Sequence, residues 1–200
     1  MVRREPIMKR MKRSIKRGGL SLAGHHPARG SRLTLVIGGG ASGKSAKALE
    51  LAGRSASRMF VATGQPLDKE MAERIRRHQE ERGAGWETAE IPMELAAWFE
   101  KHQGRYRVIV LDCMTLWLSN LLGSGVSDSD ILDRVNDLLP AIHRTRSHVI
   151  VVTNELGMGV VPFDPEARRF RDLAGHANQQ FARAADRVYF VVSGCSIQMK

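Results

Sequence analysis

The sequence predicts an α/β fold in which a mostly parallel sheet carries helices on both faces. Short runs rich in valine, isoleucine and leucine recur along the chain, and segments of helical character separate them. Continuous apolar strands are typical of parallel sheets, because helices bury both faces of such a sheet. Strands are predicted at residues 33–37, 57–64, 107–112, 148–153 and 188–192, with a short strand or extended loop at 86–90.

Helices are predicted between these strands. Asp68 and Asp164 are suited to cap the second and the last of them, and Gly83 and Gly85 stop the second. The predicted helices cover residues 46–52, 69–82, 94–102, 116–122, 129–145 and 165–185. In sheets of this kind ligands bind at the carboxyl ends of the strands, so the residues that follow the strands are the candidates for a site.

The positive charge of the chain is concentrated near its start. Residues 1–32 hold ten of the 31 basic side chains and one of the 21 acidic ones, so the remainder is nearly neutral. We predict a basic, disordered leader over residues 1–31 and a single α/β domain over residues 32–200. Such a leader would bind polyanions, act as a targeting segment, or be a dispensable extension.

Composition excludes several other classes of protein. No apolar run approaches the roughly 20 residues of a membrane span, so no membrane segment is predicted. Cys113 and Cys195 lack the spacing of a metal site or a disulfide framework. A reduced, cytoplasmic location is the simplest expectation.

A glycine-rich loop follows the first predicted strand. Gly38-Gly39-Gly40-Ala41-Ser42-Gly43-Lys44-Ser45 matches the Walker A pattern and has the strand before it and the helix after it that the pattern requires. Backbone N–H groups of such a loop face phosphate oxygens, Lys44 adds a positive charge, and Ser45 is suited to ligate Mg²⁺. Gly38-x-Gly40-x-x-Gly43 also matches the fingerprint of dinucleotide-binding proteins, but that interpretation leaves Lys44 and Ser45 without a role. The sequence therefore predicts a P-loop fold that binds a nucleoside triphosphate.

Acidic and polar residues end two later strands. Asp112 follows four apolar residues and has the position of a Walker B acid, which would hold Mg²⁺ across from Ser45. A helix-capping role is the alternative for Asp112. Asn154 and Glu155 bring polar groups to the same predicted edge, where they either meet substrate or cap the next segment.

His78 is the candidate nucleophile. Met71, Ile75, His78 and Arg82 recur at helical spacing and therefore share one stripe of the predicted helix 69–82. Arginines on either side, including Arg74, disfavour a protonated imidazole and attract a polyphosphate. A neutral imidazole beside a polyphosphate can attack phosphorus and form a phosphoramidate. The alternative is a histidine that only packs at the boundary of an amphipathic helix.

Taken together, these residues resemble one family: the bifunctional adenosylcobinamide kinase/adenosylcobinamide-phosphate guanylyltransferases of cobalamin biosynthesis. The resemblance runs from about residue 33 to residue 200. It rests on the glycine-rich loop, Ala62-Thr63, Glu70-Met71-x-x-Arg74-Ile75-x-x-His78, Trp86-x-Thr88-x-Glu90, Val152-Thr153-Asn154-Glu155-x-Gly157-x-Gly159-x-Val161-Pro162 and Phe170-Arg171-Asp172-x-x-Gly175-x-x-Asn178-Gln179.

The resemblance implies a RecA-like P-loop fold, commonly assembled as a homotrimer, and two reactions. ATP or GTP phosphorylates adenosylcobinamide, and GTP then donates GMP to that phosphate through a histidine, which is His78 here, giving adenosylcobinamide-GDP and pyrophosphate. The implied metal is Mg²⁺, held by Ser45 and Asp112. The implied nucleotide contacts are Gly38 to Ser45, Ala62, Thr63, Gly64, Gln79, Glu80, Glu81, Arg82, Glu90 and Asp112.

Two positions depart from the family pattern. Gly40-Ala41 stands where the family usually has Ala-Arg, so the loop lacks one cation. Arg77 stands where some members have a second histidine, which leaves His78 as the candidate. Two other functions stay open at this point: a P-loop kinase of a different small molecule, and a RecA-like ATPase that binds nucleic acid through its leader.

The nucleic-acid alternative is tested by nucleotide hydrolysis with and without single-stranded polynucleotide. Because the chain beyond residue 32 is nearly neutral, we expect the hydrolysis rate to be unchanged by polynucleotide and by deletion of residues 1–31. A polynucleotide-stimulated rate that disappears with the deletion would instead identify a nucleic-acid-dependent ATPase.

Overall fold

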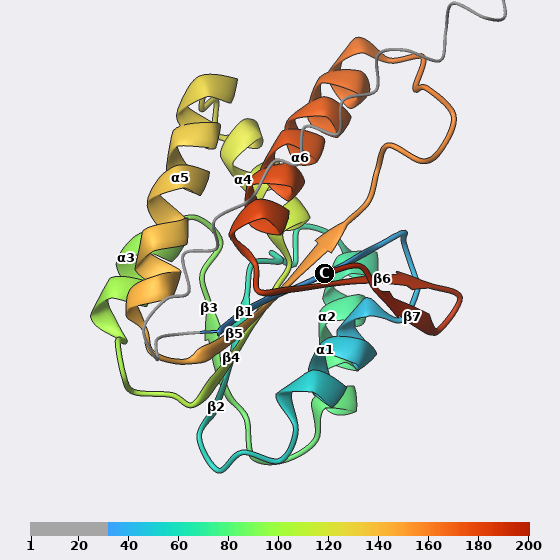
Figure 1. Ribbon diagram of the computed structural model, residues 1–200. Helices are drawn as coiled ribbons and strands as arrows, with labels where there is room; N and C mark the ends of the chain where they lie inside the picture. Colours follow the sequence, from blue (N-terminus) through green and yellow to red (C-terminus); the bar gives the residue numbers. More distant parts are fainter. Residues whose placement is uncertain (1–31) are drawn as a thin grey trace, which may run out of the picture.

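The computed structural model describes residues 32–200, apart from the side chains of Arg74 and Glu81. The leader expected over residues 1–31 lies outside the described residues. The described residues form a seven-stranded sheet in the order β3-β2-β4-β5-β1-β6-β7 (Figure 1). The strands are β1 (Arg32–Gly38), β2 (Arg58–Ala62), β3 (Glu87–Glu90), β4 (Val108–Asp112), β5 (His148–Asn154), β6 (Arg187–Val192) and β7 (Cys195–Gln198).

Strands β1 to β6 run parallel, and only β7 is antiparallel to its neighbour. The register aligns the carboxyl ends of the strands: Gly38 pairs with Asn154 and with Val191, while Ala62 pairs with Asp112. Residues that are far apart in sequence therefore meet at one edge of the sheet.

Helices cover both faces of the sheet, as the sequence predicts (Figure 1). Helices α3 to α6 share one apolar core with Leu33 and Leu35, whereas Val36 points to the opposite face and packs with α1. Helix α2 lies on the same side as α1. The helices are α1 (Lys44–Ala52), α2 (Lys69–Arg82), α3 (Leu95–Lys101), α4 (Met114–Gly123), α5 (Asp128–Arg144) and α6 (Pro165–Ala184).

The predicted helices and strands are confirmed to within a few residues. Asp68 and Asp164 cap α2 and α6, accepting hydrogen bonds from Met71 N at 2.7 Å and Ala167 N at 2.8 Å. Residues 87–90 form a strand rather than a loop. Strand β7 was not predicted, because all four of its residues are exposed and lack an apolar pattern. No described helix is both long and apolar enough to cross a membrane.

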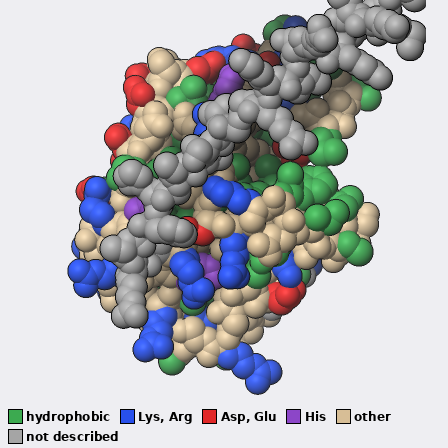
Figure 2. Space-filling view, viewed as in Figure 1, with side chains coloured by type: hydrophobic (Ala, Val, Ile, Leu, Met, Phe, Trp, Pro, Cys, Tyr) green, Lys and Arg blue, Asp and Glu red, His purple; other side chains and the backbone are tan. Residues whose placement is uncertain are grey.

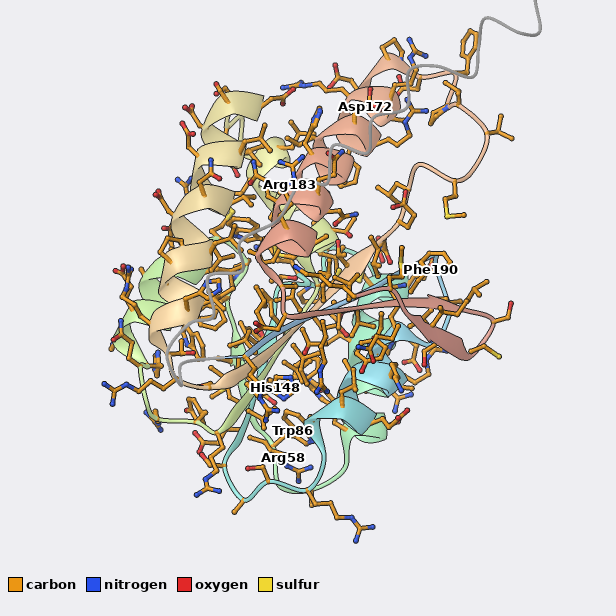
Figure 3. All side chains as sticks on the ribbon, viewed as in Figure 1. Arg58, Trp86, His148, Asp172, Arg183 and Phe190 are labelled. Atoms are coloured by element: carbon orange, nitrogen blue, oxygen red, sulfur yellow. The ribbon has the colours of Figure 1, made fainter. Side chains whose placement is uncertain are left out.

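The edge of the sheet opposite the glycine-rich loop carries a half-buried histidine. His148 begins β5, and its Nε2 lies 2.9 Å from Thr34 Oγ1. Arg58 and Trp86 lie at the same end of the sheet (Figure 3). Burial and the positive charges of Arg32 and Arg187 lower the pKa of His148, and the charge of Asp186 opposes them only in part.

This lowered pKa predicts a loss of stability in mild acid. The unfolded chain takes up a proton at His148 below about pH 6.5, whereas the folded chain resists it. The free energy of unfolding from urea titrations should therefore fall as the pH drops from about 7 to 5. His148→Asn should make that dependence shallower, and His176→Asn, at an exposed position of α6, should not. An unchanged slope in His148→Asn would contradict this assignment.

Candidate nucleotide site

The glycine-rich loop, residues 38–45, bends so that its backbone can surround an anion. Gly43 has φ 96°, a left-handed conformation that glycine adopts without strain, and it precedes the first turn of α1. The backbone N–H groups at the start of a helix and the positive end of the helix dipole attract phosphate. Lys44 is buried, and its Nζ donates to the carbonyl oxygen of Gly39. The lysine side chain therefore links the end of the loop to its beginning.

A hydroxyl and a carboxylate meet beside the loop. Ser45 Oγ donates to Asp112 Oδ2 at 2.7 Å, joining α1 to the carboxyl end of β4. Both groups supply the hard oxygen ligands that Mg²⁺ prefers, and Mg²⁺ usually takes one or two protein ligands together with substrate phosphates and water. The residues present therefore fit a magnesium ion that is bound together with a nucleotide.

One cleft of about 340 Å³ brings these groups together with α2. The loop and α1 contribute one wall, the ends of β2, β4 and β5 form the floor, and α2 forms the other wall. The residues that line it are Ala41, Ser42, Gly43, Lys44, Ser45, Ala46, Phe60, Ala62, Gly64, Met71, Ile75, Arg77, His78, Gln79, Arg82, Asp112, Cys113, Leu116, Val152 and Asn154.

The helical stripe predicted on α2 faces this cleft. Met71, Ile75, His78 and Arg82 all line it. Met71 and Ile75 give the stripe its apolar part, and His78 and Arg82 carry the polar groups. The stripe therefore presents both apolar and polar side chains to the cleft.

Arg82 is held on an aromatic ring at the far side of the cleft. Its guanidinium lies 3.9 Å from the centre of the Phe60 ring, and Nη1 is buried without a hydrogen-bond partner. Phe60 in turn meets Trp86 edge-on, with ring centres 6.1 Å apart, and Arg58 lies over Trp86. Burial lowers the pKa of Arg82, against the opposing charges of Asp112 and Glu90. An anion in the cleft would satisfy the unpaired N–H of Arg82.

Several of the expected nucleotide contacts lie outside the cleft lining. Thr63 is buried, and its hydroxyl donates to the carbonyl oxygen of Cys113 at 2.7 Å and accepts from Cys113 N at 2.9 Å. Glu80 forms an ion pair with Arg76 on the exposed side of α2. Gly38, Gly39, Gly40 and Glu90 do not line the cleft. The side chain of Glu81 lies outside the described residues.

Some lining residues had no functional signal in the sequence. Phe60, Leu116 and Val152 are apolar positions indistinguishable from core residues, although Phe60 shares a strand face with Ala62. Cys113 also lines the cleft, but burial raises the pKa of its thiol to about 12. This cysteine therefore stays protonated, and its sulfur caps α4 by accepting from Leu116 N at 3.5 Å.

Asn154 is held in place by a buried polar network. Its backbone N–H donates to Thr115 Oγ1 at 2.8 Å, and its carbonyl oxygen accepts from Asn178 Nδ2 at 3.0 Å. Thr153 Oγ1 completes the network by donating to Asn178 Oδ1 at 2.7 Å. Because α4 and α6 fix its backbone on both sides, Asn154 is directed to the cleft edge, where the sequence places it.

A glycine-rich loop with a buried lysine, beside a strand-end carboxylate in a parallel sheet, defines a P-loop nucleotide-binding protein. Residues 34–199 match the family model of cobinamide kinase / cobinamide phosphate guanyltransferase. The chain therefore belongs to this family, and the expected class, a kinase and guanylyltransferase of cobalamin biosynthesis, is confirmed at the level of the family.

The similar curated proteins align with this chain over almost their whole length. The bifunctional adenosylcobalamin biosynthesis proteins CobU of Salmonella typhimurium and Escherichia coli are each 39% identical over 180 residues, covering 84% of this chain and 99% of theirs. CobP of Pseudomonas aeruginosa is 39% identical over 168 residues, covering 83% and 96%. A KaiC-like protein of Pyrococcus horikoshii aligns with a TM-score of 0.46 and 10% identity, over 80% of this chain and 70% of that one.

Lys44→Ala is expected to weaken nucleotide binding selectively. Charge-assisted hydrogen bonds contribute about 1.5–3 kcal/mol, so the Kd for GTP from calorimetry should rise roughly 10- to 150-fold. Lys47→Ala is the matched control one turn along α1, where the ammonium pairs with exposed Glu50 at 2.7 Å. Equal weakening by both substitutions would show that general charge, rather than the loop lysine, attracts the nucleotide.

Proposed function

We propose that this chain phosphorylates adenosylcobinamide with ATP or GTP and then transfers GMP from GTP, through His78, to adenosylcobinamide phosphate. The observation that carries the proposal is the single cleft lined by both Lys44 of the glycine-rich loop and His78 of α2. A P-loop kinase of another small molecule would need the loop but would have no use for a nucleophile on the opposite wall.

In the kinase step the acceptor hydroxyl of the corrinoid attacks the γ-phosphorus of the nucleotide. A new oxygen–phosphorus bond forms, the β–γ bridge breaks, the nucleoside diphosphate leaves, and the hydroxyl proton is released. Lys44 and the N–H groups of the loop stabilise the negative charge that develops on the phosphate oxygens. Asp112 and Ser45 would hold Mg²⁺, which neutralises phosphate charge when it is bound.

In the transfer step a ring nitrogen of His78 attacks the α-phosphorus of GTP. A nitrogen–phosphorus bond forms, the α–β bridge breaks, and pyrophosphate leaves. A phosphate oxygen of the phosphorylated corrinoid then attacks the same phosphorus, which breaks the nitrogen–phosphorus bond and restores His78. Arg82 and Arg77 line the cleft near this group, and their positive charges favour the approach of a triphosphate.

Assembly and location belong to the same proposal: a homotrimer, as the family resemblance implies, in the reduced cytoplasm that the cysteine content favours. Support for assembly comes from apolar side chains that the described part of the chain leaves exposed, among them Val160 and Phe163 in the loop after β5. Figure 2 shows further hydrophobic side chains over the β6–β7 hairpin, where Val192, Ile197 and Met199 are exposed. Contact with other copies would remove this surface from water.

Transfer of label from GTP tests the proposal. Incubation with α-³²P-labelled GTP should give a covalent label that is stable to base and labile to acid, as a phosphoramidate is. Adenosylcobinamide phosphate should then discharge the label, with formation of labelled adenosylcobinamide-GDP. His78→Ala should abolish the label, because the attacking nitrogen is gone.

His176→Ala is the control, since this residue is exposed on α6 and does not line the cleft. A label that persists in His78→Ala would refute the assigned nucleophile. A wild-type protein that transfers the γ-phosphate but never takes up the α-label would leave only the kinase.

A further inference from the structure

The turn of the β6–β7 hairpin lies directly against the glycine-rich loop. Ser193 and Gly194 form this turn, with φ 50° and 79°. The backbone N–H of Gly194 donates to the carbonyl oxygen of Ser42 at 2.9 Å. The contact is tight as well, because a Cβ added to Gly43 would lie 3.4 Å from Gly194 Cα. The last strands of the chain thus touch the loop that the sequence assigns to phosphate.

This hydrogen bond sets the direction of one peptide group in the loop. The Ser42–Gly43 peptide bond is trans, so its C=O and N–H point in opposite directions. With the Ser42 oxygen fixed on the hairpin, the Gly43 N–H must point away from the hairpin. No acceptor among the described residues takes that N–H, and Gly43 lines the cleft. Such an N–H is available to a phosphate oxygen.

Strand β6 braces the start of the same loop. A Cβ at Gly38 would lie 2.1 Å from the carbonyl oxygen of Val191, so only glycine allows this approach. Val191 Cγ1 would also lie 3.9 Å from a Cβ at Gly43. The loop is therefore held at its first residue by β6 and at its fifth and sixth, Ser42 and Gly43, by the β6–β7 turn.

We infer that the β6–β7 hairpin positions the glycine-rich loop for phosphate, with Gly194 as the positioning residue. Gly194 acts through Ser42 and Gly43 and does not itself line the cleft. The inference rests on the nucleotide-binding part of the proposed function. It assigns a role to β7, which pairs with β6 through Cys195–Gln198 and fixes the turn.

Substitution of Gly194 tests the inference. Valine opposes a positive φ, so Gly194→Val should displace the turn and free the Ser42 carbonyl. We expect the Kd for GTP from calorimetry to rise about tenfold, the loss of roughly one charge-assisted hydrogen bond. At saturating GTP the extent of labelling on His78 should return to that of the wild type, because the chemistry is untouched. Gly194→Asn, which tolerates the positive φ and keeps the N–H, should restore affinity.

Gly104→Val is the matched control. Gly104 also has a positive φ, 71°, and its N–H donates to Thr145 O at 3.0 Å in the loop before β4. This substitution should lower the melting temperature without changing the Kd for GTP. If Gly194→Val does not fold, Gly194→Ala replaces it, because alanine also opposes the positive φ while its Cβ meets no atom within 4 Å.

Two results would overturn the inference: a Kd within twofold of the wild type in folded Gly194→Val or Gly194→Ala, or equal weakening by Gly104→Val. Failure of the proposed function looks different, because the wild type would then bind GTP without labelling His78, or would not bind it.

Discussion

The in-register parallel pairing of β2, β4, β5 and β1 is the constraint on which the site depends. It pairs Ala62 with Asp112 and Asp112 with Val152, and it places the Gly38–Asn154 pair two residues further along the same carboxyl edge. A slip of one residue between β1 and β5 would turn every side chain of the slipped strand to the other face of the sheet. The continuous apolar composition of these strands therefore contributes to chemistry as well as to stability, because it fixes where the polar residues after them meet.

The two walls of the cleft differ in how they are held. The loop wall is part of the sheet edge and is fixed by backbone contacts on several sides. The α2 wall carries mostly charged residues and meets the rest of the domain through a few contacts, such as Ile75 near Gly64 and the guanidinium of Arg82 on the Phe60 ring. A rigid wall suits the triphosphate, which is the same in ATP and GTP. A more lightly held wall suits the proposed role of His78, which would receive GMP and then release it.

Much of this arrangement could be predicted from the sequence, because its signals are local. Apolar runs predicted the strands, Asp68 and Asp164 predicted two caps, and helical spacing predicted the cleft-facing stripe of α2. What depends on tertiary contacts could not be predicted. The hydrogen bond of the Thr63 hydroxyl to Cys113 and the ion pair of Glu80 with Arg76 are examples, while the nucleotide contacts that the resemblance implies for these two residues stay predictions. Strand β7 was missed because exposed residues carry no pattern, although Ser193-Gly194 is a hairpin turn signal.

The stack of Arg58, Trp86, Phe60 and Arg82 connects the amino end of the sheet with the cleft. Arg58 and Trp86 contact no substrate in the proposed reaction, yet through Phe60 they determine where Arg82 lies in the cleft. Variation among relatives should therefore be correlated at these four positions: a smaller ring at one of them would be accepted in evolution only with a compensating change at its neighbour. Selection for nucleotide use would thus extend to residues at the opposite end of the sheet. Changes at those residues would look neutral if only the residues that line the cleft were considered functional.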